Sequence, residues 1–311
     1  PVVSTPTTAQ AVCSGTAVAI PLSSNITGTT YSWTVTQNGV TGATSGTGNN
    51  IAQTLINNGA VSGTATYIVT PTANGCAGAP LSVVVTVLPK PANIITPTTQ
   101  TICSGSATNI ALSSNVAGAT YSWTVVQSGL NGAIAGTGNT IAQMLNTTAA
   151  VTGSATYTIT PTANGCVGNT STVIVTVNTI PATPVAITGA DVPCAGSTQT
   201  YTTGAVTGAA GYVWSLPPGW TGTSTTNSIT VTVGSNSGSI NVAASNTCGI
   251  SPALTKAVIA TPVLTPSVSI ISDAPSLHCS GTMVNFTASI TNGGNNPVYQ
   301  WMRNGRLVGA N

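Results

Sequence analysis

Charged residues are what this sequence lacks most. Of its 311 residues only 2% are charged, with four Lys and Arg, two Asp, no Glu and one His, and the formal net charge is +2. An ordinary soluble domain carries about 25% charged residues. Binding to DNA or RNA needs several Lys or Arg to neutralise phosphates, and no part of this chain can supply them. The composition therefore excludes nucleic acids as partners.

The same scarcity argues against catalysis. General acid–base chemistry needs a tuned carboxylate pair or a histidine with an orienting partner. The two carboxylates, Asp191 and Asp273, lie in different repeats, and the single histidine, His278, adjoins Cys279 near a linker. We therefore expect that the chain is not an enzyme.

Metal ions and cofactors are not expected either. Ca²⁺ takes six to eight oxygen ligands, usually with several carboxylates, whereas each of two linkers has one Asp nearby and the first has none. The glycine-rich stretches at 45–50 and 135–140 neither open a helix nor carry a Lys, as a phosphate-binding loop does. We interpret both stretches as turns.

Long apolar runs are also missing. The mean hydropathy of +0.35 comes from Ala, Val and the lack of charge. No run reaches 18 apolar residues, so we expect no transmembrane helix and no insertion into a membrane. The chain starts without Met and stops at Asn311 partway through a repeat, and we interpret it as an internal piece of a longer polypeptide.

Cysteine and tryptophan, in contrast, recur at fixed intervals. Tryptophan follows the first cysteine of a repeat by 20 residues three times and by 22 the fourth time. The series is Cys13, Trp33, Cys76; Cys103, Trp123, Cys166; Cys194, Trp214, Cys248; and Cys279, Trp301. A period of this size indicates an array of similar modules. We expect module 1 at residues 1–90, module 2 at 91–180, module 3 at 181–262, and the first half of module 4 at 263–311.

Seven regularly spaced cysteines without any CxxC pair indicate disulfides and an oxidising, extracytoplasmic compartment. We expect pairing within modules. Each such bond would close a loop of roughly 55 to 65 residues and contribute on the order of 4 kcal/mol. The expected pairs are Cys13 with Cys76, Cys103 with Cys166, and Cys194 with Cys248, which leaves Cys279 unpaired with its partner beyond Asn311.

Alternating Val, Ile, Thr and Tyr between glycine-rich turns predict short strands and no helix. Examples are "TYSWTV" at 30–35, "TYIVT" at 66–70 and "LSVVVTV" at 81–87. Several strands per module together with Cys…Trp…Cys are typical of an immunoglobulin-like β-sandwich. The fold class is therefore all-β, a tandem array of such modules, with one core tryptophan each at Trp33, Trp123, Trp214 and Trp301.

Trp220 stands outside this tryptophan series, in the loop "LPPGWTG". An exposed tryptophan there could stack on a sugar ring, which makes Trp220 a candidate ligand contact. The alternative, which we favour, is that the ring folds over the edge of the sheet and shields apolar surface.

The sequence of residues 194–249 resembles the PKD-like repeats of Bacteroidota surface proteins. "TATYIVTPTANGC" at 64–76, with its copy in module 2, is similar to the same group, and "YQWMRNG" at 299–305 resembles related Ig-like repeats. Such repeats occur in giant cell-surface adhesins, including gliding-motility adhesins exported by type IX secretion, and as spacers in secreted hydrolases. The resemblance implies an extracellular location on a bacterial cell surface.

We therefore expect a stiff, non-catalytic segment of a large surface protein that serves adhesion. Its partners would be neighbouring repeats of the same polypeptide and an extracellular surface or glycan. The alternatives are a carbohydrate-binding module, a passive spacer of a secreted hydrolase, and a self-associating filament subunit. The filament alternative arises because edge strands are normally protected by charged residues, which this chain almost lacks.

Overall fold

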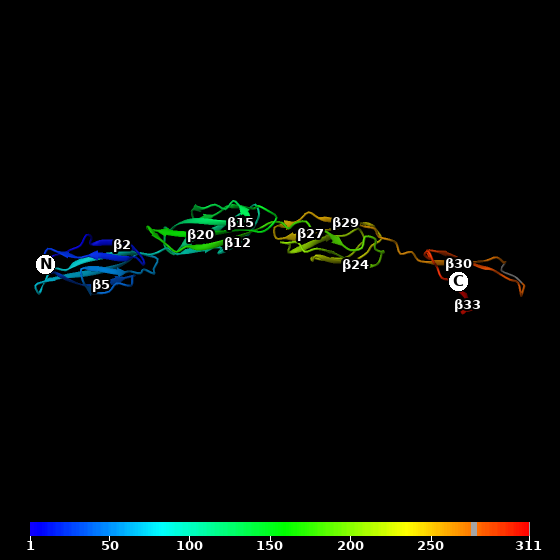
Figure 1. Cartoon of the computed structure of the whole chain (residues 1–311), viewed down its shortest axis with the longest axis horizontal. Helices are drawn as coiled ribbons and strands as arrows, with labels where there is room; N and C mark the ends of the chain where they lie inside the picture. The colour runs from blue at the N-terminus through cyan, green and yellow to red at the C-terminus, as the bar shows by residue number, and fades with distance from the viewer. Residues whose placement is uncertain (275–278, 311) are drawn as a thin grey trace. The chain divides into compact units, whose positions relative to one another are not determined.

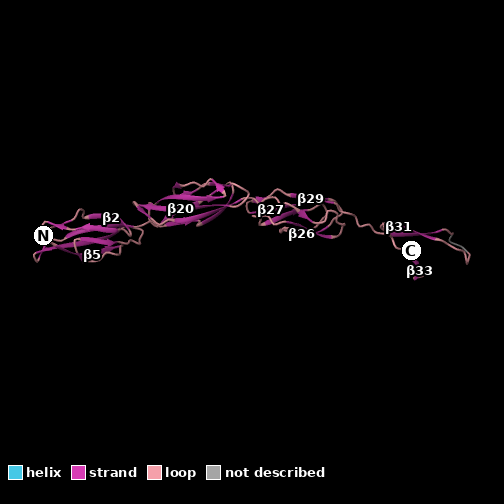
Figure 2. Cartoon of the chain, viewed as in Figure 1, coloured by secondary structure: helices cyan, strands magenta, loops and turns pink. Residues whose placement is uncertain are grey.

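The structure is a computed structural model that describes residues 1–274 and 279–310. In these two ranges every regular element is a β-strand (Figure 2). They include no apolar helix long enough to cross a membrane. His278, which we considered for catalysis, lies outside the described residues.

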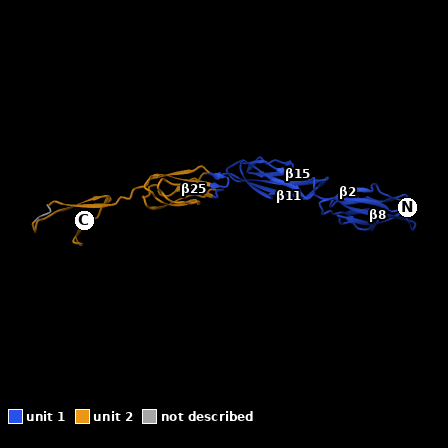
Figure 3. Ribbon diagram, turned by 180° about the vertical axis from the view of Figure 1, so that it is seen from behind, with its two compact units in different colours: residues 1–182, 207–210, 245–250 blue, residues 183–206, 211–244, 251–311 orange. Residues whose placement is uncertain are grey.

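The chain divides into two compact units, coloured blue and orange in Figure 3. Unit 1 comprises residues 1–182 together with 207–210 and 245–250, and unit 2 comprises the remaining residues from 183 onward. Unit 1 therefore holds modules 1 and 2 and two short segments from the module 3 range.

Module 1 is built from two layers of strands, of which Figure 1 labels β2 and β5. The larger sheet has the order β2-β10-β8-β5-β6, with β9 paired to β8, and the smaller layer includes the pairs β3–β7 and β1–β4. The strands are β1 (Val3–Ser4), β2 (Ala9–Cys13), β3 (Ala17–Pro21), β4 (Ser23–Ser24), β5 (Thr30–Asn38), β6 (Gly46–Thr47), β7 (Asn50–Thr54), β8 (Gly63–Ala73), β9 (Cys76–Ala77) and β10 (Leu81–Leu88).

Module 2 repeats this plan. Its larger sheet has the order β12-β22-β20-β15-β17, with β21 paired to β20, and two three-stranded sheets, β11-β14-β18 and β13-β19-β16, complete it. The strands are β11 (Asn93–Thr96), β12 (Thr99–Cys103), β13 (Ser106–Ala107), β14 (Ile110–Ser114), β15 (Thr120–Ser128), β16 (Leu130–Asn131), β17 (Gly136–Thr137), β18 (Thr140–Ile141), β19 (Met144–Thr147), β20 (Gly153–Ala163), β21 (Cys166–Val167) and β22 (Ser171–Asn178).

Module 3 has one sheet of order β23-β24-β26 and a second in which β27 pairs with β25, β28 and β29. In module 4, β30 pairs with β31 and β32 pairs with β33. The strands are β23 (Ile187–Thr188), β24 (Thr198–Thr203), β25 (Gly211–Ser215), β26 (Ser228–Thr232), β27 (Gly238–Asn246), β28 (Gly249–Ile250), β29 (Leu254–Val258), β30 (Ser267–Ser272), β31 (Phe286–Thr291), β32 (Gln300–Arg303) and β33 (Arg306–Ala310).

The alternation of side chains along each strand creates the cores. In β8 every second residue is buried, including Ala65, Tyr67 and Val69, and in β10 Val83 and Val85 are fully buried. Because successive side chains of a strand point to opposite faces, these residues line one face of the larger sheet. They pack in a cluster with residues of the smaller layer.

Three separate hydrophobic clusters result, each drawn from one of modules 1, 2 and 3. Two-layered packing of mainly antiparallel sheets around such a cluster is the architecture of the immunoglobulin-like sandwich; the parallel pairs are β2 with β10 and β12 with β22. The predicted all-β array of immunoglobulin-like modules is confirmed.

Candidate functional site at the module ends

The cysteines form two disulfides, both within unit 1. Cys13 is bonded to Cys166, with a Cα–Cα distance of 5.6 Å and a sequence separation of 153. Cys103 is bonded to Cys248, with a Cα–Cα distance of 5.4 Å and a sequence separation of 145. Each bond therefore joins the first cysteine of one module to the second cysteine of the next.

The predicted pairing within modules is wrong, and the length of one strand explains why. Cys13 lies beside Leu88, at the end of β10, whereas Cys76 comes before Leu81, at its beginning. At about 3.3 Å per residue, β10 separates these two ends by roughly 23 Å. A disulfide requires a Cα–Cα distance of about 4.4 to 6.8 Å. The two cysteines of a module thus lie at opposite ends of the sandwich.

The first cysteine of a module ends a strand that runs parallel to the last strand. Cys13 ends β2 beside β10, and Cys103 ends β12 beside β22, where it lies opposite Asn178. The chain then turns through Gly15 and Gly105, whose φ angles of 79° and 84° lie in the left-handed region that favours glycine. Each turn presents its cysteine at the C-terminal end of its module.

The second cysteine follows a tight turn at the opposite end. Cys166 opens β21 and pairs in register with Ala163 of β20, and its side chain has no exposed surface. Cys248 lies between β27 and β28. Next to it, the Asn246 side-chain nitrogen donates to the carbonyl of Thr179 over 2.8 Å. The disulfide between Cys103 and Cys248 thus lies where the turn after β27 contacts the linker at Thr179. We call the two disulfides that join successive modules staples.

Three of the cysteines in the described residues carry no disulfide. They are Cys76, Cys194 and Cys279, and all three are exposed. We had predicted disulfides for Cys76 and Cys194, so this prediction is wrong for both residues in this chain.

Trp220 packs inside module 3. Only 6% of its surface is exposed, and its ring lies 6.3 Å from that of Tyr201, centroid to centroid. The indole nitrogen donates to the carbonyl of Asn236 over 2.8 Å. The ring is therefore not available to stack on a sugar. The candidate ligand contact at Trp220 is wrong, and the residue packs against apolar side chains of its module, the alternative that we favoured.

The other tryptophans differ in burial. Trp33 and Trp123 are each 7% exposed and belong to the clusters of modules 1 and 2. Trp214 is partly buried against the cluster of module 3, and Trp301 is partly buried in module 4. Sequence spacing alone does not distinguish the buried from the partly buried tryptophans, because it does not show that Trp220 belongs to the core cluster of module 3.

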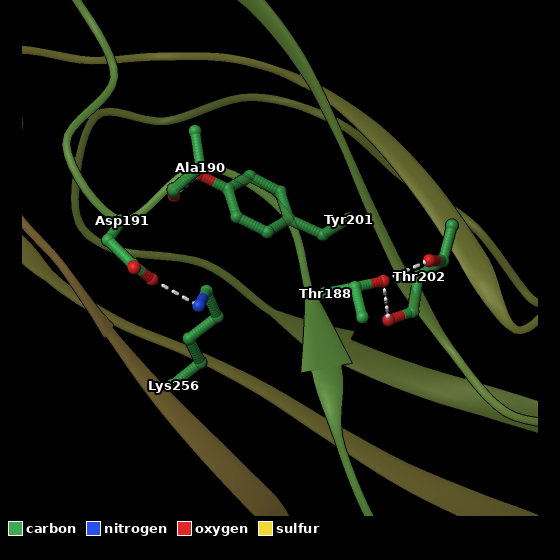
Figure 4. Close-up of polar contacts among 6 residues, drawn as sticks. All are labelled: Thr188, Ala190, Asp191, Tyr201, Thr202 and Lys256. Atoms are coloured by element: carbon green, nitrogen blue, oxygen red, sulfur yellow. Dashed lines mark hydrogen bonds and ion pairs between the residues drawn. The ribbon is translucent and has the colours of Figure 1, made fainter.

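The charged side chains of module 3 meet at one corner, shown in Figure 4. Lys256 forms an ion pair with Asp191, and the hydroxyl of Tyr201 donates to the carbonyl of Ala190 over 2.8 Å. Burial, followed by the negative charge of Asp191, raises the pKa of Tyr201. The carboxylate of Asp191 is thus engaged by an ammonium group.

Asp273 is held in a turn of module 4. Its carboxylate accepts hydrogen bonds from the backbone and side-chain nitrogens of Asn285, over 2.8 and 2.7 Å. These bonds, the backbone one foremost, lower the pKa of Asp273. Both acidic residues are therefore occupied by local partners.

Comparison with known proteins identifies the repeats. Domains described as PKD-like match residues 10–91 and 100–181, and a second PKD-like domain type matches residues 180–258. Domains of this kind are typically non-catalytic structural modules. No curated protein matches the chain in sequence.

Solved structures of similar fold are multi-domain proteins with low sequence identity. The Escherichia coli adhesin FdeC is 18% identical, with a TM-score of 0.36, over 83% of this chain and 96% of that chain. The FN1–FN3 domains of chicken CNTN1 are 13% identical, with a TM-score of 0.33, over 79% of this chain and 95% of that chain. Sidekick-1 immunoglobulin domains 1–5 are 12% identical, with a TM-score of 0.35, over 97% of this chain and 68% of that chain. At such values these likenesses carry no argument about function.

Proposed function

Because the chain belongs to the family of PKD-like domains, we propose that it is a non-catalytic structural and adhesive segment of a large repetitive protein outside the cell. Disulfides persist in oxidising compartments such as the cell exterior, and this chain holds two of them. Its function in this proposal belongs to the array of modules and not to a single pocket.

The observation that carries the proposal is that the disulfides join successive modules. Domains connected by a linker alone ordinarily move relative to each other. The bond between Cys13 and Cys166 fixes two Cα atoms of modules 1 and 2 at 5.6 Å, in addition to the linker. Two covalent connections at one joint restrict bending and twisting. We therefore propose that the chain is a stiff spacer that holds adhesive regions of the same protein away from the cell.

The site of action that we propose is a bacterial cell surface. Support comes from the resemblance of residues 194–249 and of the "TATYIVTPTANGC" motif to repeats of Bacteroidota adhesins. The same resemblance supports gliding motility as the process and type IX secretion as the export route.

The contact surface that we propose for adhesion is neutral. Thr, Ser, Asn and Gln crowd every segment, and the net charge is +2, so long-range electrostatic steering toward a partner is weak. Such a surface favours hydrogen bonding to a neutral material, for example a glycan or a hydrated solid. Lateral association of copies along their uncharged edge strands is a further form of the same contact.

Small-angle X-ray scattering under oxidising and reducing conditions tests the stiffness. Modules of eight to ten residues per strand at about 3.3 Å each are roughly 30 Å long, so three modules and half of a fourth, end to end, would extend on the order of 100 Å. We expect a narrow distribution of maximum dimensions near that value for the oxidised chain and a broader one after reduction. Equal distributions in both conditions would contradict the proposed stiffening.

Adhesion is tested separately, by binding of the oxidised chain to a glycan array and to bare glass. Binding would support direct adhesion by these modules. No binding to either surface would contradict the adhesive part and leave the spacer role.

A further inference from the structure

Cys76 lies on the same turn as Cys166, the second cysteine of the first staple. Each of the two begins a short strand, β9 or β21, that pairs with the long strand before it. The asparagine two residues earlier, Asn74 or Asn164, has a φ of 51° in both modules. Two residues after each cysteine, a glycine N–H donates to a proline carbonyl, over 2.8 Å in module 1 and 2.9 Å in module 2. The backbone around Cys76 is therefore that of a bonded second cysteine.

The segment that enters module 1 follows the path of the linker that enters module 2. The N–H of Val2 donates to the side-chain oxygen of Asn25 over 2.9 Å, and the N–H of Ala92 donates to that of Asn115 over 2.8 Å. The residues that follow pair in the same register, β1 with β4 and β11 with β14. The start of module 1 is therefore held as the linker is held on module 2.

Both segments pass directly over the turn that carries the second cysteine. A Cβ added to Gly168 would lie 1.8 Å from the carbonyl oxygen of Pro91, and a Cβ added to Gly78 would lie 1.9 Å from that of Pro1. Glycine permits so close an approach because it has no Cβ. The entering segment is therefore seated against the cysteine turn in module 1 as it is in module 2.

In the first staple, the last strand that leads into the linker also positions the first cysteine. Cys13 ends β2, which runs parallel to β10, and lies opposite Leu88, shortly before Pro91. The linker then crosses the turn of module 2 to which Cys13 is bonded. A module whose last strand leads into Pro1 in the same way would place its first cysteine beside Cys76.

The two second cysteines differ in burial. Cys166, which is bonded to Cys13, has no exposed surface, whereas Cys76 is exposed and carries no disulfide. The other unbonded cysteines of the described residues, Cys194 and Cys279, are first cysteines of later modules. Both staples join a first cysteine to the second cysteine of the following module. The position of Cys76 therefore calls for a first cysteine from a module that precedes module 1.

We propose that Cys76 is the receiving half of a further staple, whose other half is the first cysteine of a PKD-like module that precedes Pro1 in the same polypeptide. The proposal rests on the function proposed above, in which staples join successive modules, and adds to it a site and a partner. Formation of the bond removes two protons and two electrons from the two thiols. A small disulfide such as oxidised glutathione takes them up and becomes two thiols, by exchange through a mixed disulfide.

The test adds one module to the complete chain. A second copy of residues 1–90 is fused before Pro1, so that the junction repeats the one between modules 1 and 2, where a proline also follows. In the added copy, Cys76→Ser removes the spare second cysteine, and Ala17→Ser, at an exposed position of β3, labels the Cys13 peptides by mass. The chain is oxidised in a glutathione buffer, and its linked peptides are identified by mass spectrometry without reduction.

We expect Cys13 of the added copy to be bonded to Cys76 of the original module at least about tenfold more often than to Cys194 or Cys279, because docking of the added module raises the effective concentration of the two thiols. Cys13 of the original module should stay bonded to Cys166, which shows that the extended chain has folded. The matched control is Cys76→Ser in the original module, which should leave Cys13 of the added copy as a free thiol or a glutathione adduct.

A second extended chain keeps the test independent of the folding of one added module. It carries residues 91–180 before Pro1, with Cys166→Ser in the added copy, and offers Cys103 as the first cysteine. Absence of a bond to Cys76 in both chains, or equal linkage to all three exposed thiols, would overturn the proposal. Mapping of the bonds measures neither bending nor adhesion, so its failure is distinguishable from a failure of the spacer role in scattering or of adhesion in surface binding.

Discussion

At the scale of single residues, the cores of modules 1 and 2 each contain one carbonyl that accepts hydrogen bonds from two side chains, a tryptophan and a glutamine. In module 2 the carbonyl of Ile134 accepts the Trp123 indole N–H over 3.1 Å and the Gln143 amide over 2.8 Å. The Gln143 oxygen in turn accepts the hydroxyl of Tyr157 over 2.9 Å. Module 1 repeats the network around Thr44. Buried polar groups cost little when they are all bonded in this way.

This network makes the stability of module 2 sensitive to alkali. Burial raises the pKa of Tyr157 to about 12, whereas a tyrosine in an unfolded chain titrates near pH 10. Below pH 10 the Tyr157 hydroxyl is neutral in both the folded and the unfolded chain, so its ionisation does not lower the free energy of unfolding. Between pH 10 and about pH 12 the unfolded state ionises first, so the free energy of unfolding falls.

We predict that Tyr157→Phe lowers stability at pH 7 by about 1 kcal/mol, the worth of one hydrogen bond, and weakens the loss above pH 10. The Gln143 oxygen still accepts the N–H of Ile134 over 3.0 Å, so no buried acceptor is left unsatisfied. Urea unfolding at pH 7, 9 and 11 measures both effects. An unchanged slope between pH 9 and pH 11 would show that Tyr157 is not the titrating group.

A second prediction concerns the glycine beneath each core tryptophan. A Cβ on Gly136 would lie 2.8 Å from Cζ2 of Trp123, and the ring is buried and cannot move aside freely. Gly136→Ala should therefore destabilise module 2 by about 1 to 3 kcal/mol through overpacking. The matched control is Gly204→Ala, where no atom lies within 4 Å of the added Cβ. Thermal unfolding of both variants measures the loss of stability. Similar losses for Gly136→Ala and Gly204→Ala would show that overpacking against Trp123 is not the cause.

At the scale of elements, sequence alternation was enough to predict the strands but not how their ends meet. Tyr67 and Val69, on one face of β8, show the period of two directly. The parallel pairing of β2 with β10 joins residues more than seventy positions apart, and no local sequence pattern predicts it. Because this pairing puts Cys13 far from Cys76, regular spacing revealed which cysteines are equivalent but not which are bonded. Trp220 was ambiguous for the same reason, since a loop residue reaches the core only through tertiary packing.

The disulfide connectivity gives a prediction at this scale. Pepsin digestion of the unreduced chain should release a peptide with Cys13 linked to one with Cys166, and a peptide with Cys103 linked to one with Cys248. Mass spectrometry before and after reduction identifies both. A peptide linking Cys13 to Cys76 would require the two ends of β10 to meet, which would contradict the sandwich itself.

At the scale of the whole molecule, the staples change how the chain can be extended. The first disulfide spans a sequence separation of 153, and at about 3.3 to 3.6 Å per residue this segment has a contour of roughly 500 Å. Tension applied to the two ends passes from Cys13 to Cys166 through the sulfur atoms. We predict that the fully extended oxidised chain is shorter than the reduced chain by at least about 500 Å. Single-molecule pulling with and without a reductant measures the difference, and equal lengths would contradict the connectivity.

The overlap of the two disulfides has one more consequence, for a chain exposed to proteases. The first bond spans residues 13 to 166 and the second spans residues 103 to 248, so the two spans overlap in module 2. A single cut of the backbone anywhere between Cys13 and Cys248 therefore leaves the two fragments covalently joined. A protein built this way stays in one piece after a single backbone cut that would separate domains joined only by linkers.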